Sequence, residues 1–227
     1  MTRPHTQPPT SPSTPDTTMH ALRHIAAAHR TVLFLVVAAA LVSGCAPRPQ
    51  PSPAPTTSPR TPTPPYAGAP AVPKPLPIAV LDGGPCTALT QQQRIAALGK
   101  DATTAKPSHL DGIGPKCVWD AKESGAKITI YYVTEPHAGL SGLYQNSKPQ
   151  SAVWKPTEID GHPAVAYLTH QGPDPKDACA VAIGITDTVT IEVTINLGNR
   201  ALTHHADPCE LGITQATGVL ATLRERH

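Results

Sequence analysis

The chain has 227 residues, of which 28 are proline, and only 15% of its positions are charged. The first 80 residues hold 18 of the prolines and a net charge of +5, whereas residues 81–227 hold 10 prolines and a net charge of −3. Because the positive charge lies outside the part that can fold, the sequence excludes a polybasic protein that binds nucleic acid. A coiled coil and a membrane protein with several spans are also excluded.

A secretory signal is predicted at the start of the chain. Residues 31–42 form an unbroken apolar run that Arg23 and Arg30 precede and small residues follow. As a helix this run rises only about 18 Å, which is short of the roughly 30 Å hydrocarbon core of a membrane. We therefore interpret residues 1–44 as a signal peptide and not as a transmembrane helix. Translation from Met19 would give this signal a conventional length, so we expect the true start there.

Cys45 indicates how the exported chain is held. The sequence Leu-Val-Ser-Gly-Cys at 41–45 resembles the lipobox of bacterial lipoproteins, in which the cysteine receives a diacylglycerol and the signal is cut just before it. Two acyl chains, such as palmitate, anchor a protein stably where one binds only marginally. We therefore expect a lipid anchor on Cys45 at the extracytoplasmic face of the cell membrane. The alternative is a secreted protein with a stray cysteine.

The residues after the anchor are predicted to form a disordered stalk, over 45–80. Residues 46–77 contain 13 prolines, interleaved with threonine, serine and alanine. Such a composition favours polyproline II and cannot bury apolar surface. Extended at about 3.1 Å per residue, this stretch reaches roughly 100 Å at most. We interpret it as a spacer between the membrane and one domain over 81–227.

The first half of the domain alternates between helix and strand patterns. Thr90 and Gln93 have the spacing of a capping box, and Gly99 supplies a stop. Runs rich in β-branched and aromatic residues then predict strands. The elements expected here are a helix at about 90–98, strands at 117–121 and 127–134, and a short helix near 137–147.

The second half begins with a hairpin. Asp160-Gly161 is a strong two-residue turn signal between strands expected at about 153–159 and 162–169. Further on, Val189, Ile191, Val193 and Ile195 alternate with Thr188, Thr190, Glu192 and Thr194. This period of two predicts a half-buried strand with one face in water. A strand at 179–185 precedes it across a tight connection.

The chain ends in a helix pattern. Asp207 is a suitable N-cap and Pro208 stands at the first helical position, ahead of an apolar stripe that ends at Leu223. Strands linked by hairpins, with helices at both ends, predict an α+β domain. We expect an antiparallel sheet of about six strands, packed by the N-terminal and C-terminal helices.

Four cysteines remain once Cys45 is assigned to the anchor. Cys86, Cys117, Cys179 and Cys209 are an even number in an exported chain, which indicates two disulfides with three possible connectivities. The spacing favours the sequential pairs, Cys86 with Cys117 and Cys179 with Cys209, because each bond would join a helix start to a strand start. The spacings contain no Cys-x-x-Cys, so zinc is the weaker interpretation.

Several short motifs, in this order, carry a family resemblance. They are Gly-Pro-Cys86 before a helix, Cys117-x-Trp119, Ile-Asp-Gly-His-Pro-Ala at 159–164, Cys179-x-Val-x-Ile and Asp207-Pro-Cys209 before the last helix. Together they resemble the uncharacterised actinobacterial lipoprotein family catalogued as domain of unknown function 3558. The resemblance implies an exported lipoprotein and supplies no catalytic residues. The element order is also similar to PsbP-like and Mog1-like folds, which is a fold analogy alone.

No catalytic or metal site is predicted. His204, His205 and Asp207 lie close in sequence, but neighbours in extended chain point to opposite faces, so an exposed loop is favoured. His162 follows a turn, and His109 lies in a loop rich in glycine, proline and lysine. The signatures of serine hydrolases, zinc proteases and P-loop proteins are missing from the sequence. We expect no enzyme, no metal and no cofactor.

Aromatic residues are the best candidates for a binding face. Alternation places Tyr131 and Tyr132 on opposite faces of one strand, so one belongs to the core and the other to a surface or groove. Trp154, Tyr131 and Tyr132 are the possible binding residues. The sequence thus predicts a non-catalytic binding or scaffolding module that engages an unknown envelope component or protein partner. The alternatives are a carrier or sensor of an apolar envelope ligand and, less favoured, an enzyme that modifies the wall.

Overall fold

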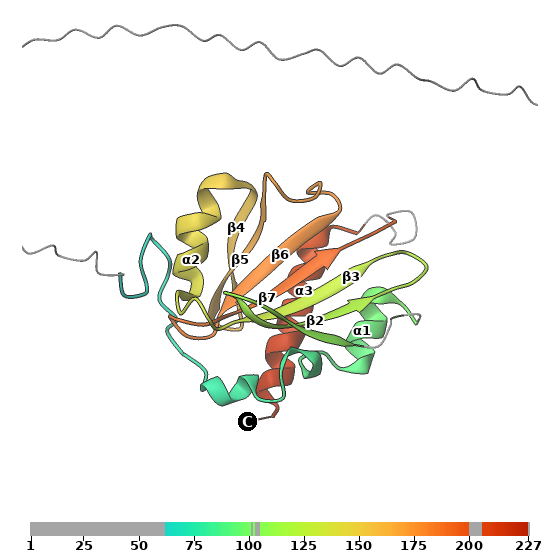
Figure 1. Ribbon diagram of the computed structural model, residues 1–227, viewed down its shortest axis with the longest axis horizontal. Coiled ribbons are helices and arrows are strands. Elements are labelled where there is room, and N and C mark those ends of the chain that lie inside the picture. The colour runs from blue at the N-terminus through green and yellow to red at the C-terminus, as the bar shows by residue number, and fades with distance from the viewer. Residues whose placement is uncertain (1–61, 101, 103–104, 200–205, 227) are drawn as a thin grey trace, which may run out of the picture. The chain divides into compact units, whose positions relative to one another are not determined.

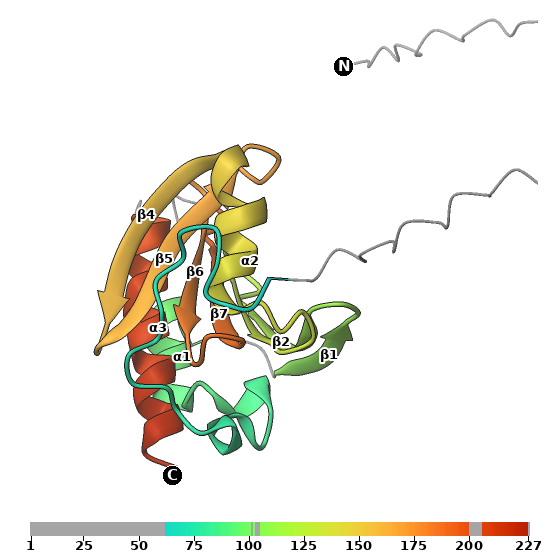
Figure 2. The same ribbon diagram turned by 90° about the vertical axis from the view of Figure 1, so that its left-hand side faces the viewer.

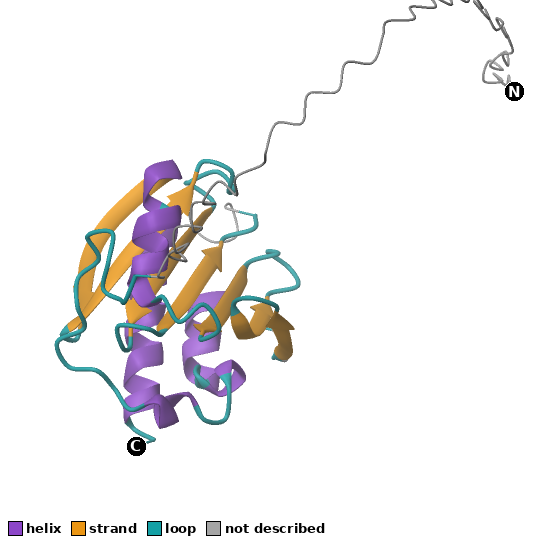
Figure 3. Cartoon of the chain, turned by 60° about the vertical axis from the view of Figure 1, so that its left-hand side comes forward, coloured by secondary structure: helices purple, strands orange, loops and turns teal. Residues whose placement is uncertain are grey.

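Seven antiparallel strands form one sheet in the order β1-β2-β3-β7-β6-β5-β4. The computed structural model describes residues 62–100, 102, 105–199 and 206–226, all of which belong to one compact unit over 57–227. The strands form a continuous layer with helices beside it (Figure 3). Their bounds are β1 Lys106–Leu110, β2 Gly114–Asp120, β3 Lys127–Val133, β4 Ser151–Ile159, β5 His162–Thr169, β6 Ala178–Gly184 and β7 Thr190–Asn196.

The helices divide between the two faces of the sheet. Helix α3, Pro208–Arg224, packs along β6 and β7, and α1, Gln91–Leu98, lies beside it (Figure 1). Helix α2, Gly139–Asn146, lies on the opposite face (Figure 2). Three short 3₁₀ turns complete the described elements: η1 Ile78–Leu81, η2 Pro85–Thr87 and η3 Lys148–Gln150. The expected α+β class is therefore confirmed.

The larger core lies between the sheet and helices α1 and α3. Strand β3 contributes Ile128, Ile130 and Tyr132 to it, and each is at most 1% exposed. The helices meet through the Gln93 side chain, which donates to the Gly218 carbonyl at 3.0 Å. The capping residues expected from sequence are in place, since Thr90 and Asp207 both accept backbone N–H groups at their helix starts.

Two disulfides attach the helical side to the sheet. Cys86 in η2 bonds to Cys117 in β2, and Cys179 in β6 bonds to Cys209 in the first turn of α3. These are the sequential pairs that the spacing favours. Each closes a loop of about 30 residues, which is worth about 3.5 kcal/mol in the chain-entropy account.

Strand β1 is a seventh strand that sequence analysis does not predict. Its five residues are all exposed, so they show no alternation of apolar and polar positions. Backbone pairing with β2, such as Ser108 opposite Lys116, holds it at the sheet edge. His109 lies in this strand, where its Nε2 is 2.6 Å from Glu135 Oε1, so the expected loop is wrong here.

The end of the predicted stalk is also different from the expectation. Val72 is only 8% exposed and Val80 only 1%, and the turn η1 begins at Ile78. The Val72 N–H donates to Asp187 Oδ1 at 2.8 Å, and the Leu76 N–H donates to the carbonyl of Ile185, the residue after β6. The expected boundary at residue 81 is therefore too late, because apolar residues between the prolines are buried by the sheet. We call residues 62–77 the N-terminal strap.

Gly139 fixes where α2 begins. Its φ of 51° is left-handed, and it lies so close to the Asp187 carbonyl that a side chain would collide with that backbone. Asp187 thus contacts the start of α2 with its backbone and the N-terminal strap with its carboxylate. The strap and α2 are held over the same end of the sheet.

Replacing Val72 with alanine should lower the free energy of unfolding by about 1–2 kcal/mol, because a buried methyl pair is removed. Urea unfolding followed by circular dichroism measures the change. The matched control is Lys74→Ala in the same strap. The Lys74 side chain is exposed, so its removal should leave the free energy of unfolding unchanged. Equal stability of the Val72→Ala protein and the parent would mean that the strap does not belong to the folded unit.

Candidate functional site

The three aromatic residues selected from sequence lie in different places. Tyr132 belongs to the core on the α3 side, where its hydroxyl donates to the Gly84 carbonyl at 3.3 Å. Tyr131 points to the α2 side, as alternation requires, and lines a cleft there. Trp154 on β4 packs edge-on against Tyr144 of α2, with ring centroids 5.1 Å apart, and does not line that cleft. The structure therefore does not unite the three in one face.

The cleft lies between α2 and the side of the sheet formed by β3 and β7, and its volume is about 410 Å³. Its walls come from five chain segments, including the N-terminal strap. Apolar side chains supply most of the walls. The lining residues are Tyr66, Leu110, Ile113, Tyr131, Val133, Pro136, Ala138, Gly139, Gly142, Leu143, Asn146, Ser147, Tyr167, Thr190 and Glu192.

Small residues on β6 create the room for this arrangement. Ala180, Ala182 and Gly184 occupy the α2 face of that strand, while the intervening residues face α3. Tyr167 on β5 is opposite Ala180, so its side chain can cross β6 above the short methyl groups. Its hydroxyl reaches Glu192 on β7 at the far side of the strand. The alanines therefore allow a side-chain bond between two strands that are not neighbours.

Glu192 forms the polar floor of the cleft. The Tyr167 hydroxyl donates to its Oε2 at 2.6 Å, and the Thr194 hydroxyl donates to its Oε1 at 3.3 Å. Tyr131 is its register partner on β3 and faces the same side. Burial raises the pKa of the Glu192 carboxyl, because removal from water disfavours the charged form, and the two hydrogen bonds oppose this only in part.

The neighbouring tyrosines respond to the same environment. Burial raises the pKa of Tyr167 above its ordinary value, and the adjacent Glu192 raises it further. The pKa of Tyr131 is also raised, first by burial and then by Glu192. Both phenols are therefore neutral hydrogen-bond donors at physiological pH, and neither is suited to act as a phenolate.

The N-terminal strap closes one side of the cleft. Tyr66 lines the cavity, and its backbone N–H donates to the buried Ser141 hydroxyl of α2 at 2.9 Å. A turn follows, with the Ala69 N–H donating to the Tyr66 carbonyl. The chain that the sequence assigns to the stalk therefore supplies an aromatic wall of the site.

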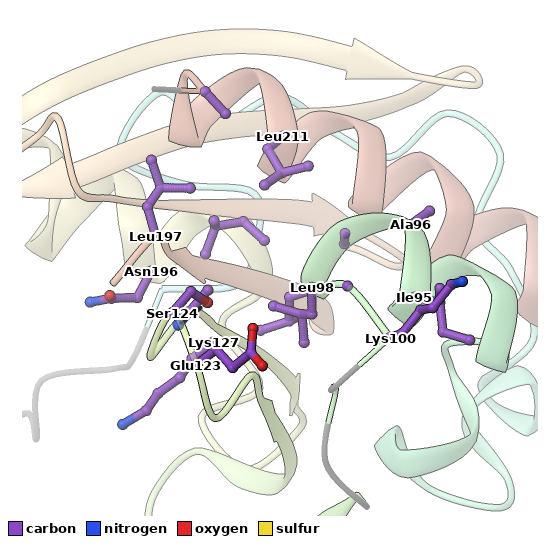
Figure 4. A pocket seen from close by; sticks show the side chains of 16 residues that line it. Ile95, Ala96, Leu98, Lys100, Glu123, Ser124, Lys127, Asn196, Leu197 and Leu211 are labelled. Atoms are coloured by element: carbon purple, nitrogen blue, oxygen red, sulfur yellow. Dashed lines mark hydrogen bonds between the residues drawn. The ribbon is translucent and has the colours of Figure 1, made fainter. Parts of the chain in front are cut away.

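A second hollow, of about 620 Å³, lies at the other end of the sheet between α1, α3 and the ends of β3 and β7. Figure 4 shows Leu98 and Leu211 lining its apolar part, with Glu123 nearby on the loop before β3. Lys100 and Ala206, which line this hollow, each adjoin residues outside the described part of the chain. The α2 cleft is therefore the better-defined site.

Two of the histidines singled out from sequence, His109 and His162, are described by the structure, and neither lines either hollow. His162 is only 1% exposed, and its Nδ1 lies 2.8 Å from the Gly184 carbonyl, so its place is structural. His204 and His205 lie outside the described residues. Within the described ranges, no group of three histidine, cysteine or acidic side chains is arranged to hold a metal ion.

Most of the chain matches the model of one protein family. The model of the family described as a protein of unknown function, DUF3558, matches residues 40–222. The chain belongs to this family. No curated protein and no solved structure matches the chain, so the analogy with PsbP-like and Mog1-like folds stays a prediction.

The match of this DUF3558 chain begins ahead of the domain boundary expected from sequence, and it includes the N-terminal strap. In the part of the chain that the structure describes, none of the helices is both long and apolar enough to cross a membrane. The site of this family member is thus built from the strap, α2 and the strands described above.

Glu192 and Tyr167 are site residues that no motif in the sequence singles out. Glu192 stands on the strand face that is expected in water, but this face is only partly exposed: Thr190 is 1% exposed and Glu192 is half-buried. The available signal was a single acid among β-branched residues. Burial of its face depends on α2 and the strap, and both are distant in sequence.

Stability should decrease with rising pH because of Glu192. The folded-state pKa of this carboxyl is raised above the value of about 4.3 in an unfolded chain. Between the two values the folded protein holds a proton that the unfolded chain has released, so stability falls as pH rises through the folded pKa. Below about pH 4 the carboxyl is protonated in both the folded and the unfolded chain, so Glu192 no longer makes stability depend on pH.

The variant Glu192→Gln lacks this carboxyl, so its stability relative to the parent should improve as pH rises from 4 to 8. Urea titrations at several pH values measure that relative change. Glu158→Gln, which alters an exposed glutamate on β4, is the control and should show no comparable trend. A constant difference between parent and Glu192→Gln would contradict a raised pKa.

Proposed function

We propose that this chain is a lipoprotein tethered at the extracytoplasmic face of the cell membrane, and that its domain binds a small ligand in the α2 cleft. The tether rests on the apolar run at 31–42 and on Cys45 in its lipobox-like context. The two disulfides support an exported domain, because such bonds persist in oxidising compartments. An actinobacterial source is part of the same proposal.

The observation that carries the binding role is the cleft itself. Its volume of about 410 Å³ lies in the range of small-molecule sites, and it combines apolar walls with few polar groups. Glu192 and Tyr167 are fixed to each other at 2.6 Å, which gives a ligand one oriented polar contact in an apolar cavity. This combination favours a ligand with an apolar body and one polar end.

We favour binding over catalysis because the polar groups of the cleft do not include a nucleophile with an adjacent base. Glu192 is bonded to Tyr167 and Thr194, and Thr190 and Ser147 line other parts of the wall. The proposal is therefore a carrier or sensor of a small envelope ligand, a role that agrees with the apolar-ligand alternative from sequence.

Replacing Cys45 with alanine should move the protein from the membrane fraction to the medium or the unanchored pool, because no diacylglycerol can be attached. Fractionation followed by immunoblotting measures the distribution. Ser43→Ala is the matched control, since it keeps a small residue in the lipobox and should leave the protein with the membrane. Membrane association of Cys45→Ala equal to that of the parent would contradict the lipid anchor.

The purified protein should bind the neutral apolar dye N-phenyl-1-naphthylamine at one saturable site, with a rise in dye fluorescence. Leu143→Trp fills the α2 cleft and should weaken binding at least about 10-fold, because the apolar space is lost. The control Leu211→Trp instead fills the second hollow and should leave binding unchanged. Loss of binding only in Leu211→Trp would place the ligand in the other hollow, and no binding by the parent would refute the cleft as a site.

A further inference from the structure

The cleft carries a single ionisable charge of one sign. Among its fifteen lining residues, Glu192 is the one acid, and none is lysine, arginine or histidine. Within the described ranges, no basic side chain lies within 4.0 Å of the Glu192 carboxylate. The Glu192 side chain is half-buried, and a partly desolvated carboxylate without a counter-charge is costly. A cation that enters the cleft would supply the partner that the cleft residues do not.

The carboxylate also has unused hydrogen-bonding capacity. A carboxylate offers about four acceptor positions on its two oxygens. Tyr167 takes one position on Oε2, and Thr194 takes one on Oε1 through a longer contact of 3.3 Å. The remaining positions are free to accept N–H donors from a ligand, and a charged donor makes the stronger bond.

Aromatic rings line the space around this carboxylate. Tyr66 comes from the N-terminal strap, Tyr131 from β3 and Tyr167 from β5, so three separate segments contribute a ring to one cleft. The face of an aromatic ring attracts cations within about 6 Å. The Tyr131 ring already does so toward Lys116 of β2, whose Nζ lies 5.6 Å from the ring centroid. Lys116 itself does not line the cleft.

We propose that the ligand of the α2 cleft is an organic cation, with an ammonium group at Glu192 and an apolar body against Val133 and Leu143. This inference rests on the proposed binding function and names the chemical class of its ligand. An anionic ligand would meet the Glu192 charge without a compensating cation. A neutral ligand would bind without gaining a charge pair from Glu192.

The proposal predicts how affinity depends on pH. An ammonium ligand needs the carboxylate form of Glu192, so binding releases a proton wherever that carboxyl is protonated in the free protein. Affinity should therefore increase with pH until Glu192 is fully ionised. Besides Glu192, the titratable residues that line the cleft are Tyr131 of β3, Tyr167 of β5 and Tyr66 of the strap.

Other titratable groups do not supply this dependence. Tyr131 and Tyr167 have raised pKa values and stay neutral below pH 9. Helix α2 and its C-cap contribute only Asn146 and Ser147 as polar side chains at the cleft, and neither titrates. The His109 and Glu135 pair at β1 does not line the cavity.

The test compares hexylammonium with 1-hexanol, which share an apolar body and differ in charge. Each compound competes with N-phenyl-1-naphthylamine bound to the full domain, at pH 5 and pH 8. An alkylamine stays protonated over this range, as lysine with its pKa of about 10.4 does. Hexylammonium should bind at least about 10-fold more tightly than hexanol at pH 8, which is the size expected of a close charge pair. The preference should be smaller at pH 5.

Two variants identify the groups responsible. Glu192→Gln keeps the size of the side chain and should reduce the preference for hexylammonium to about 2-fold or less, since the charge pair is removed. Tyr131→Leu should weaken hexylammonium more than hexanol, because a cation–π contact is lost and an apolar surface is kept. Glu158→Gln is the control and should leave both affinities unchanged.

The outcomes separate this inference from the proposed function. Equal affinity for hexylammonium and hexanol, in a protein that binds the dye, overturns the cationic ligand and leaves the binding function in place. Failure of the dye to bind overturns both. If Glu192→Gln does not fold, the parent protein alone still tests the inference. A preference for hexylammonium over hexanol that does not increase from pH 5 to pH 8 overturns it.

Discussion

The whole arrangement depends on the unequal faces of strand β6. One face presents Val181 and Ile183 to α3, and the other presents Ala180, Ala182 and Gly184 to α2. Close packing requires each face to be matched by its neighbours. Large side chains fill the α3 side, whereas the short side needs other segments to approach the backbone closely. Helix α2, the strap and the Tyr167 ring all use that space.

The two unequal faces of β6 give the domain a packed core on the α3 side and a cleft on the α2 side. On the α3 side, the Cys179–Cys209 bond fixes the start of the helix to β6 and completes a dry core. On the α2 side, a shorter helix covers only part of the sheet, which leaves a cleft beside it. A carboxyl is tolerated there because the Tyr167 hydroxyl is brought to it across the small residues.

Local signals in the sequence predicted most of the elements and little of the site. The Asp160-Gly161 turn, the Thr90 cap and the alternation in β7 act within a few residues, so each could be recognised from sequence. Strand β1 was not predicted because its five residues are all exposed, so no alternation of apolar and polar positions marks it. The role of Glu192 in the cleft was not predicted for a different reason. The burial of a strand face depends on segments that come from elsewhere in the chain and pack against it.

The strap was missed because its composition hides its packing. Frequent prolines suggested a segment without a core, yet polyproline-like chain can still present single side chains to a surface. Val72 and Leu76 do so, and the prolines that alternate with them prevent the segment from being predicted as a helix or a strand. The backbone donors between the prolines find partners in Asp187 and in the end of β6.

The contact between Val72 and Gly184 has a consequence for substitutions in the strap and in the sheet. A Cβ at position 184 would meet the Val72 side chain at 2.8 Å and Leu140 at 3.2 Å, so these side chains must shift before a larger residue fits there. A substitution at position 184 and one at position 72 therefore act on the same space, and their effects on stability should not be additive. A segment with the composition of a spacer is thus subject to the packing limits of the core.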